Sequence, residues 1–247
     1  MNEINGQCSK VIKDGSINSC HFPRVLLTNI NHVLNKIDEL KVVAESQNVD
    51  IICLTESWLD KDIPDNFCAF GDFSVFRKDR SIGHGGGVLC YISSRCQGSL
   101  IYPVTHGHLD ADLEVLWLLV RPKILPRPLS CIIIAIVYAP SWCSVQRCRD
   151  LRIYILALID YFSTKYVFPG FIVCGDFNSF NTDFLCSLLH FKQKVNEPTR
   201  GGNILDNYLL IAKSIYYDAV IHPPIGRSDH NCVLVLPSMN KSSNVGA

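Results

Sequence analysis

The fold of this chain is decided by the segment Phe171-Ile172-Val173-Cys174-Gly175-Asp176-Phe177-Asn178, in which an uninterrupted apolar run ends on two polar side chains. Such a run predicts a strand that is buried on both faces. Side chains two positions apart on an extended chain point the same way, so we expect Asp176 and Asn178 to share a face. A carboxylate beside an amide suits the holding of a water molecule against a phosphate, although an Asp-x-Asn turn explains the two residues equally well.

Apolar runs of the same kind recur on both sides of this segment. They predict strands over 24–28, 49–55, 85–93, 113–120, 130–138, 204–211 and 232–236. Helical spacing of apolar residues predicts helices over 35–46, 146–164 and 182–190. Many strands with few helices between them indicate two sheets packed face to face with helices outside. We therefore expect an α/β (α+β) protein, a four-layer α/β/β/α sandwich with mainly antiparallel sheets.

The composition fits one large globular domain without a basic surface. The chain has 247 residues, 48% of them hydrophobic, and Lys+Arg equals Asp+Glu at 23 each. A net charge of zero excludes a basic coat over the whole molecule, so a nucleic-acid partner would need a local patch. Basic residues gather at 77–80 and at 147–152, where solvated loop and helix charges are an equally good explanation. We expect the domain to span 23–237, between flexible tails at 1–22 and 238–247.

The cysteines and the apolar runs point to an intracellular protein without a membrane partner. The 12 cysteines form no Cys-x-x-Cys pair, and several lie inside apolar runs, where a reduced cysteine acts as a small hydrophobe. A reducing compartment is therefore favoured over a disulfide framework. Residues 1–20 lack the apolar core of a signal peptide, and the longest apolar run, 131–140, is too short to span a bilayer.

A carboxylate interrupts the chain directly after the apolar run 51–55. Glu56 occupies that position, and a carboxylate at the end of a buried strand is costly unless something pairs with it. Mg²⁺ is one such partner, because it prefers oxygen ligands and needs only one or two protein carboxylates. A surface glutamate at the start of a loop is the simpler alternative.

Three more polar residues stand at the borders of apolar runs. His230, within Ser228-Asp229-His230, precedes the last run and could donate a hydrogen bond to a phosphoryl oxygen. Asp206 lies in an otherwise apolar strand, so it needs a partner, and His230 is a candidate. Tyr138 ends the strand 130–138, where its hydroxyl could meet a phosphate or simply face water. A capped loop with a satisfied histidine explains the first of these segments without any catalysis.

Taken in order, these segments resemble the endonuclease/exonuclease/phosphatase superfamily, which has the fold of the abasic-site nucleases and of DNase I. More narrowly, they resemble the endonuclease domain of non-LTR (LINE-type) retrotransposons of the CR1/jockey kind. The resemblance runs from about residue 25 to 236. It rests on Asn29, on the helix start at 35–40, and on the blocks at 54–59, 77–80, 85–88, 137–140, 175–178, 197–206 and 226–230.

The resemblance implies a phosphodiesterase dependent on Mg²⁺ (or Mn²⁺) that nicks one DNA strand, leaving a 3′-hydroxyl and a 5′-phosphate. Glu56 would bind the metal, with Asn29 beside it as a further ligand or as the group that orients the metal or the phosphate. Asp229 would complete the metal side or the histidine network. The metal and the histidine together would neutralise charge that develops in the transition state.

The resemblance also assigns the groups that act on water and phosphate. Asp176 would align and deprotonate the attacking water, and Asn178 and Tyr138 would hold the phosphate. His230 would stabilise the pentacovalent transition state, oriented by Asp206.

The sequence departs from these elements at three places. Residues 30–33 read Ile-Asn-His-Val rather than Ala-Arg-Ser-Leu, which removes an arginine that could touch DNA. Tyr138 is followed by Ala-Pro-Ser rather than Arg-Pro-Pro, and Asp206 by Asn207 rather than an apolar residue. None of the departures removes an expected catalytic group.

We expect the chain to be a fragment, a truncated copy or a captured domain, because the reverse transcriptase of the parent element is absent. DNA would be its partner, and a stable protein partner is not inferred. The nucleus would give it access to chromosomal DNA, with the cytoplasm as the alternative location. Two alternatives stay open: a phosphatase or phospholipase of the same superfamily, and a non-catalytic remnant that at most binds nucleic acid.

Overall fold

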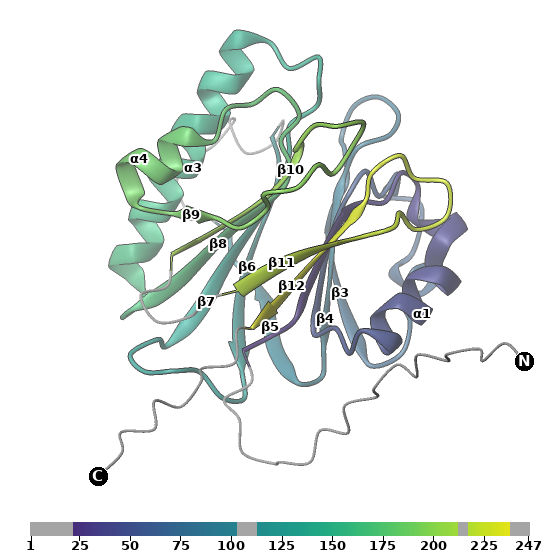
Figure 1. Cartoon of the computed structure of the whole chain (residues 1–247), viewed down its shortest axis with the longest axis horizontal. Helices are drawn as coiled ribbons and strands as arrows, with labels where there is room; N and C mark the ends of the chain where they lie inside the picture. Colours follow the sequence, from purple (N-terminus) through teal and green to yellow (C-terminus); the bar gives the residue numbers. More distant parts are fainter. Residues whose placement is uncertain (1–21, 103–112, 212–216, 238–247) are drawn as a thin grey trace, which may run out of the picture.

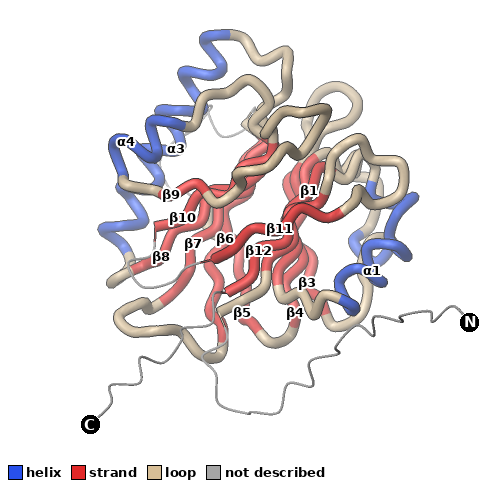
Figure 2. The backbone as a smooth tube through the Cα atoms, viewed as in Figure 1, coloured by secondary structure: helices blue, strands red, loops and turns tan. Residues whose placement is uncertain are grey.

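The computed structural model describes residues 22–102, 113–211 and 217–237. The expected tails therefore lie outside the described residues, apart from Phe22, which is buried in the core rather than part of a tail. Two six-stranded sheets pack against each other, and helices cover their outer faces (Figures 1 and 2). No helix within the described ranges has the length and apolar character that crossing a membrane requires.

The first sheet, sheet A, carries the N-terminal and C-terminal strands. Its strands β1 and β2 run parallel, and the other neighbours are antiparallel. The helix α1 (Ile37–Ser46), preceded by the 3-10 turn η1 (Val33–Lys36), covers its outer face. In order across the sheet, the strands are β11 (Tyr217–His222), β12 (Cys232–Pro237), β1 (Val25–Asn29), β2 (Ile51–Thr55), β4 (Val88–Ser93) and β3 (Phe73–Lys78).

The second sheet, sheet B, comes from the middle of the chain. Its central strands β7 and β8 are parallel and are connected by the long helix α3 (Val145–Lys165). The helices α3 and α4 (Asp183–Leu189) pack on its outer face. In order across the sheet, the strands are β5 (Cys96–Leu100), β6 (Glu114–Pro122), β7 (Cys131–Tyr138), β8 (Pro169–Asp176), β10 (Asp206–Ile211) and β9 (Lys192–Gln193). A short 3-10 turn, η2 (Asp65–Phe67), lies between β2 and β3.

The apolar runs are continuous because each central strand is buried on both faces. In β7, Ile132, Ile134 and Ile136 belong to the core between the sheets. The alternate residues, among them Ile133 and Val137, pack under α3. A third core lies between sheet A and α1. The four-layer α/β/β/α sandwich predicted from the sequence is therefore confirmed.

Gly175 lies against the backbone of the neighbouring strand β7, where a side chain has no room. It lies in β8 opposite Val137 of β7 and Asn207 of β10, with φ at +141°. A Cβ at this position would lie 1.8 Å from the carbonyl oxygen of Val137, which is backbone and has no freedom to move aside. Only glycine fits here, one residue before Asp176.

Replacing Gly175 with alanine is expected to destabilise the fold by about 3 kcal/mol or more, from backbone strain plus overpacking. The measurement is the free energy of unfolding in urea. Gly201→Ala is the matched control, because it also has positive φ but nothing lies within 4 Å of its added Cβ; we expect it to cost about 1 kcal/mol. Equal effects of the two substitutions would show that β7 and β8 do not approach as described.

Candidate active site

Polar side chains take over where the apolar rows between the two sheets end. In β1 the row Val25, Leu27 continues to Asn29, and in β8 the row Ile172, Cys174 continues to Asp176. Tyr138 follows Ile136 in β7, and Asp206 precedes Tyr208 in β10, with the same spacing of two residues. Because side chains two apart share a face, all four enter the space between the sheets at one end of the sandwich.

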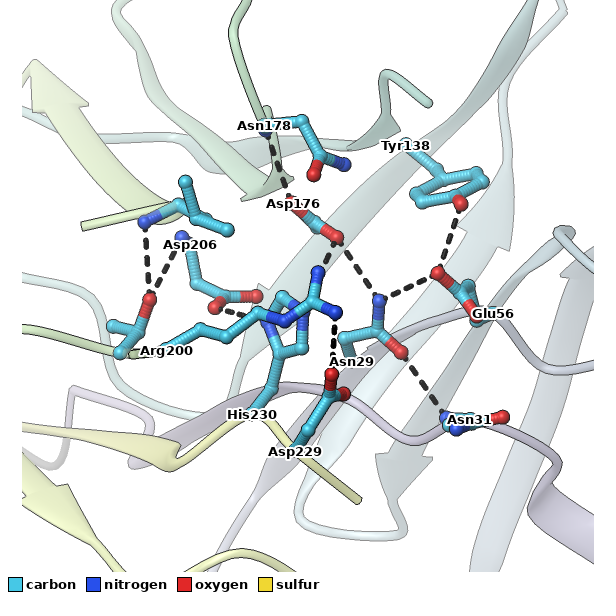
Figure 3. A network of polar contacts seen from close by, with 12 residues as sticks. Asn29, Asn31, Glu56, Tyr138, Asp176, Asn178, Arg200, Asp206, Asp229 and His230 are labelled. Carbon is cyan, nitrogen blue, oxygen red and sulfur yellow. Dashed lines mark hydrogen bonds and ion pairs between the residues drawn. The ribbon is translucent and has the colours of Figure 1, made fainter. Parts of the chain in front are cut away.

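Asn29 joins carboxylates from both sheets. Its amide nitrogen donates to Glu56 Oε1 at 2.9 Å and to Asp176 Oδ2 at 2.9 Å (Figure 3). The hydroxyl of Tyr138 donates to the same Glu56 oxygen at 2.8 Å. Burial and the nearby Glu56 raise the pKa of Tyr138, so its hydroxyl stays protonated as a donor. These contacts bring together Asn29, Glu56, Tyr138 and Asp176, as the sequence predicted.

Asp176 is buried and its pKa is raised. Loss of solvation is the largest cause, followed by the negative charge of Asp206, and together they bring the pKa of Asp176 to about 6. His230, the Asn29 amide and the Asn178 backbone N–H oppose the shift. A carboxylate with this pKa is largely ionised at neutral pH and is a better proton acceptor than an exposed aspartate.

His230 and Asp206 form a buried pair beside Asp176. The distance from His230 Nδ1 to Asp206 Oδ2 is 2.7 Å, and His230 Nε2 lies 3.9 Å from Asp176 Oδ2. Burial alone lowers the pKa of His230, but the hydrogen bond and charge of Asp206, with the charges of Asp176 and Asp229, outweigh it and raise the pKa. The pairing of His230 with Asp206 expected from the sequence is therefore present.

Two hydroxyls hold this pair in place. Ser228 Oγ donates to the backbone carbonyl of Asn29 at 2.7 Å and accepts from the backbone N–H of His230 at 3.2 Å. Thr199 Oγ1 accepts the backbone N–H of Asp206 at 3.1 Å. The motifs quoted from the sequence contain both residues, but only the folded loops show what each hydroxyl binds.

Asn178 does not share an extended face with Asp176, contrary to the expectation from strand geometry. The strand β8 ends at Asp176, and Asn178 follows in a turn with φ at +45°. Its backbone N–H donates to Asp176 Oδ1 at 3.0 Å, and its side-chain amide donates to the carbonyl of Ala139 at 3.0 Å. The Asp-x-Asn turn is thus the correct description of this segment, and it fixes the carboxylate of Asp176.

Asp229 lies at the rim of the site. Its side chain is 54% exposed and forms an ion pair with Arg200, 2.5 Å from Asp229 Oδ2 to Arg200 Nη2 (Figure 3). It acts on His230 through its charge, while its carboxylate is occupied by Arg200. Arg200 belongs to the Pro-Thr-Arg-Gly block, yet sequence reasoning gave it no role, because nothing in the block indicates its distance from Asp229.

Two groups of donor atoms at the site fit a divalent cation, one around Asp206 and one around Glu56. Asp206 Oδ1 is buried without a hydrogen-bond partner, and ligand atoms of Asp176, Asp206 and His230 lie within 4.8 Å of one another. Glu56, which is only partly buried, is linked to Asp176 by the Asn29 amide, which donates to both carboxylates. Asn29 itself suits orientation rather than ligation, because its nitrogen donates to both carboxylates and its oxygen accepts from the backbone of Asn31.

The fold is shared with nucleases and phosphatases of known structure. The catalytic domain of Xenopus laevis APE2 is 19% identical with a TM-score of 0.65, covering 88% of this chain and 94% of that one. The 3′ phosphatase NExo from Neisseria, bound to a product DNA hairpin, is 14% identical with a TM-score of 0.64, covering 88% of this chain and 100% of that one. The endonuclease domain of TRAS1, a telomere-specific non-LTR retrotransposon, is 15% identical with a TM-score of 0.60, covering 89% of this chain and 100% of that one.

Comparison with protein-family models and with curated proteins gives no match. At these identities the structural likeness shows the fold, which is the DNase I-like α/β sandwich of these neighbours.

The first test of the site is the pKa of the His230 imidazole, measured by NMR titration of the metal-free protein. We expect a pKa above the 6.5 of a free histidine, and a lower pKa in Asp206→Asn, which removes the hydrogen-bonded charge. Asp229→Asn is the control, and its effect should be smaller because the Asp229 carboxylate is exposed and paired with Arg200. An unchanged pKa in Asp206→Asn would contradict the described pair.

Proposed function

We propose that this chain is a divalent-metal-dependent phosphodiesterase that nicks one strand of DNA. The observation that carries the proposal is the meeting of Glu56, Asp176 and His230 at one end of the inter-sheet core, joined through Asn29 and Asp206. The structural neighbours favour phosphate esters of nucleic acids as substrates, since they include an endonuclease domain and a phosphatase bound to DNA.

Asp176 is the group that accepts the proton of the attacking water in this proposal. Its two oxygens are held by the Asn29 amide and by the Asn178 backbone, so the carboxylate has one orientation. Its raised pKa of about 6 leaves it ionised at neutral pH yet basic enough to take a proton. The attack would break the bond from phosphorus to the 3′ oxygen, which takes up a proton from solvent, so the products carry a 3′-hydroxyl and a 5′-phosphate.

His230 is the cation of the site. Its raised pKa favours the protonated ring, and Asp206 fixes the ring through Nδ1. Nε2 faces Asp176 at 3.9 Å, so a phosphoryl oxygen placed beside Asp176 could accept its proton in a hydrogen bond. Tyr138 and Asn178 border the same space and would hold the phosphate, as the resemblance implies.

We place Mg²⁺ or Mn²⁺ at Glu56 with Asp176, where it would neutralise phosphate charge when bound. On the side toward Asp206, the raised pKa of His230 favours a protonated ring, and a divalent ion there would meet like charge. Glu56 is partly exposed and keeps Oε2 available, with only a 3.3 Å contact from the Trp58 indole N–H. Asp229 serves the histidine network rather than the metal.

We also propose that the domain derives from a non-LTR retrotransposon and acts in the nucleus. The order of the sequence motifs supports the origin, and so does the likeness to the TRAS1 endonuclease domain over 89% of this chain. A phosphatase is the second candidate, favoured by the likeness to the 3′ phosphatase from Neisseria. Release of inorganic phosphate from a 3′-phosphorylated oligonucleotide, without plasmid nicking, would favour it.

The direct test is nicking of supercoiled plasmid in Mg²⁺, read as conversion to the open-circular form. We expect Glu56→Gln and His230→Gln each to lower the rate by about 100-fold or more, the usual effect of losing a transition-state contact. Asp160→Asn, an exposed acid-to-amide change on α3, is the matched control and should keep the parent rate. Equal nicking by all four proteins would contradict the assignment, and nicking by none would favour the non-catalytic remnant.

The metal position is tested by thermal unfolding with and without Mg²⁺. At an Mg²⁺ concentration of about 100 times Kd, a bound ion should raise the melting temperature of the parent by about 5–10 °C. We expect Glu56→Gln to abolish this increase and Asp206→Asn to keep most of it, because Asp206 is not a ligand in the proposed arrangement. The opposite result would move the ion to the Asp176, Asp206 and His230 cluster.

A further inference from the structure

Aromatic and cationic side chains alternate in a row that leads outward from Tyr138. The guanidinium carbon of Arg80 lies 5.6 Å from the ring centroid of Tyr138 and 5.6 Å from that of Trp142. The guanidinium carbon of Arg147 also lies 5.6 Å from the ring centroid of Trp142. Trp142 is 63% exposed although two cations lie near its ring, so the row presents an aromatic surface to solvent.

Hydrogen bonds within the protein hold the Arg80 side chain, and Glu114 neutralises its charge. Its Nε and Nη2 donate to Glu114 Oε1 at 3.0 and 2.7 Å, and its Nη1 donates to the carbonyl of His84 at 2.9 Å. Glu114 is itself buried, and its Oε2 accepts the backbone N–H of Gly87 at 2.5 Å. Because the charge of Arg80 is satisfied within the protein, the row favours a ligand with a flat π face over a bare phosphate.

A cavity of about 250 Å³ adjoins Trp142. It is smaller than the roughly 300–1,000 Å³ of sites for drug-sized ligands, so it suits one planar group. Ile82, which is 80% exposed, offers an apolar wall. The residues that line it include Arg80, Ile82, Glu114, Trp142 and Arg147.

We propose that Trp142 is a stacking platform for one unpaired nucleobase of the DNA strand that carries the reactive phosphate. The inference rests on the proposed function and deepens it, because Tyr138 connects the platform to the site by donating to Glu56 at 2.8 Å. Stacking on an aromatic ring needs no particular base, so the platform selects unpaired over paired DNA rather than a sequence. The residues after Tyr138 are among those where the sequence departs from the CR1/jockey pattern.

The test measures binding by fluorescence anisotropy in a His230→Gln background, in which cleavage is slowed by about 100-fold or more. The probes are a fully paired duplex and the same duplex with one unpaired nucleotide. We expect the bulged duplex to bind about tenfold more tightly, and Trp142→Ala to remove that preference. Trp142→Phe should retain most of it, and Phe67→Ala, which alters an exposed aromatic residue outside the cavity, should leave it unchanged.

Three outcomes distinguish this inference from the proposed function. Loss of the preference in Trp142→Ala, with rescue by phenylalanine, supports the platform. Plasmid nicking by the parent together with equal binding of both probes, or an unchanged preference in Trp142→Ala, overturns the platform and leaves the nuclease assignment standing. Absence of both nicking and DNA binding overturns the proposed function and the platform with it.

Discussion

The side-chain amide of Asn29 is the contact on which the site depends, because it binds carboxylates from both sheets at once. Glu56 follows β2 of sheet A, and Asp176 ends β8 of sheet B. Two carboxylates at the edge of an apolar core repel each other and lose solvation, so a donor between them offsets part of that cost. The backbone of Asn29 is tied in turn to the loop of His230 through Ser228. One residue thus sets the spacing of the acidic groups and the position of the histidine.

How far the fold could be predicted follows from where each strand lies. The central strands are buried on both faces, so their sequences are continuous apolar runs that indicate strands directly. The four strands that the sequence did not reveal, β3, β5, β9 and β11, are the outermost strands of the two sheets. An edge strand is only partly covered, so it has no need of an apolar run. Cys96–Leu100, for example, alternates between intermediate and exposed positions around Gly98.

The site could be predicted where a residue type conflicted with its surroundings. Glu56, Asp176 and Asp206 each place a carboxylate at the border of an apolar strand, and such conflicts are visible in the sequence. Asn178 was misplaced because the extended geometry stops at Asp176, and the left-handed turn that follows has no unambiguous sequence signal. The partnership of Arg200 with Asp229 depends on how two loops approach each other, which no local pattern encodes.

Two cations lie near the site of a chain that has no net charge. Arg80 and Arg200 are each paired with a carboxylate, but the two pairs differ in burial. Glu114 is buried, so separating it from Arg80 would leave a charge without solvation, and that pair stays closed. Arg200 and Asp229 are about half exposed, and such a pair contributes only about 0–1 kcal/mol. Replacing the Asp229 carboxylate by another anion beside Arg200 therefore costs little free energy. Arg200 can thus pair with an anion at the rim of the site, although the molecule has no permanently positive surface that would bind polyanions without selection.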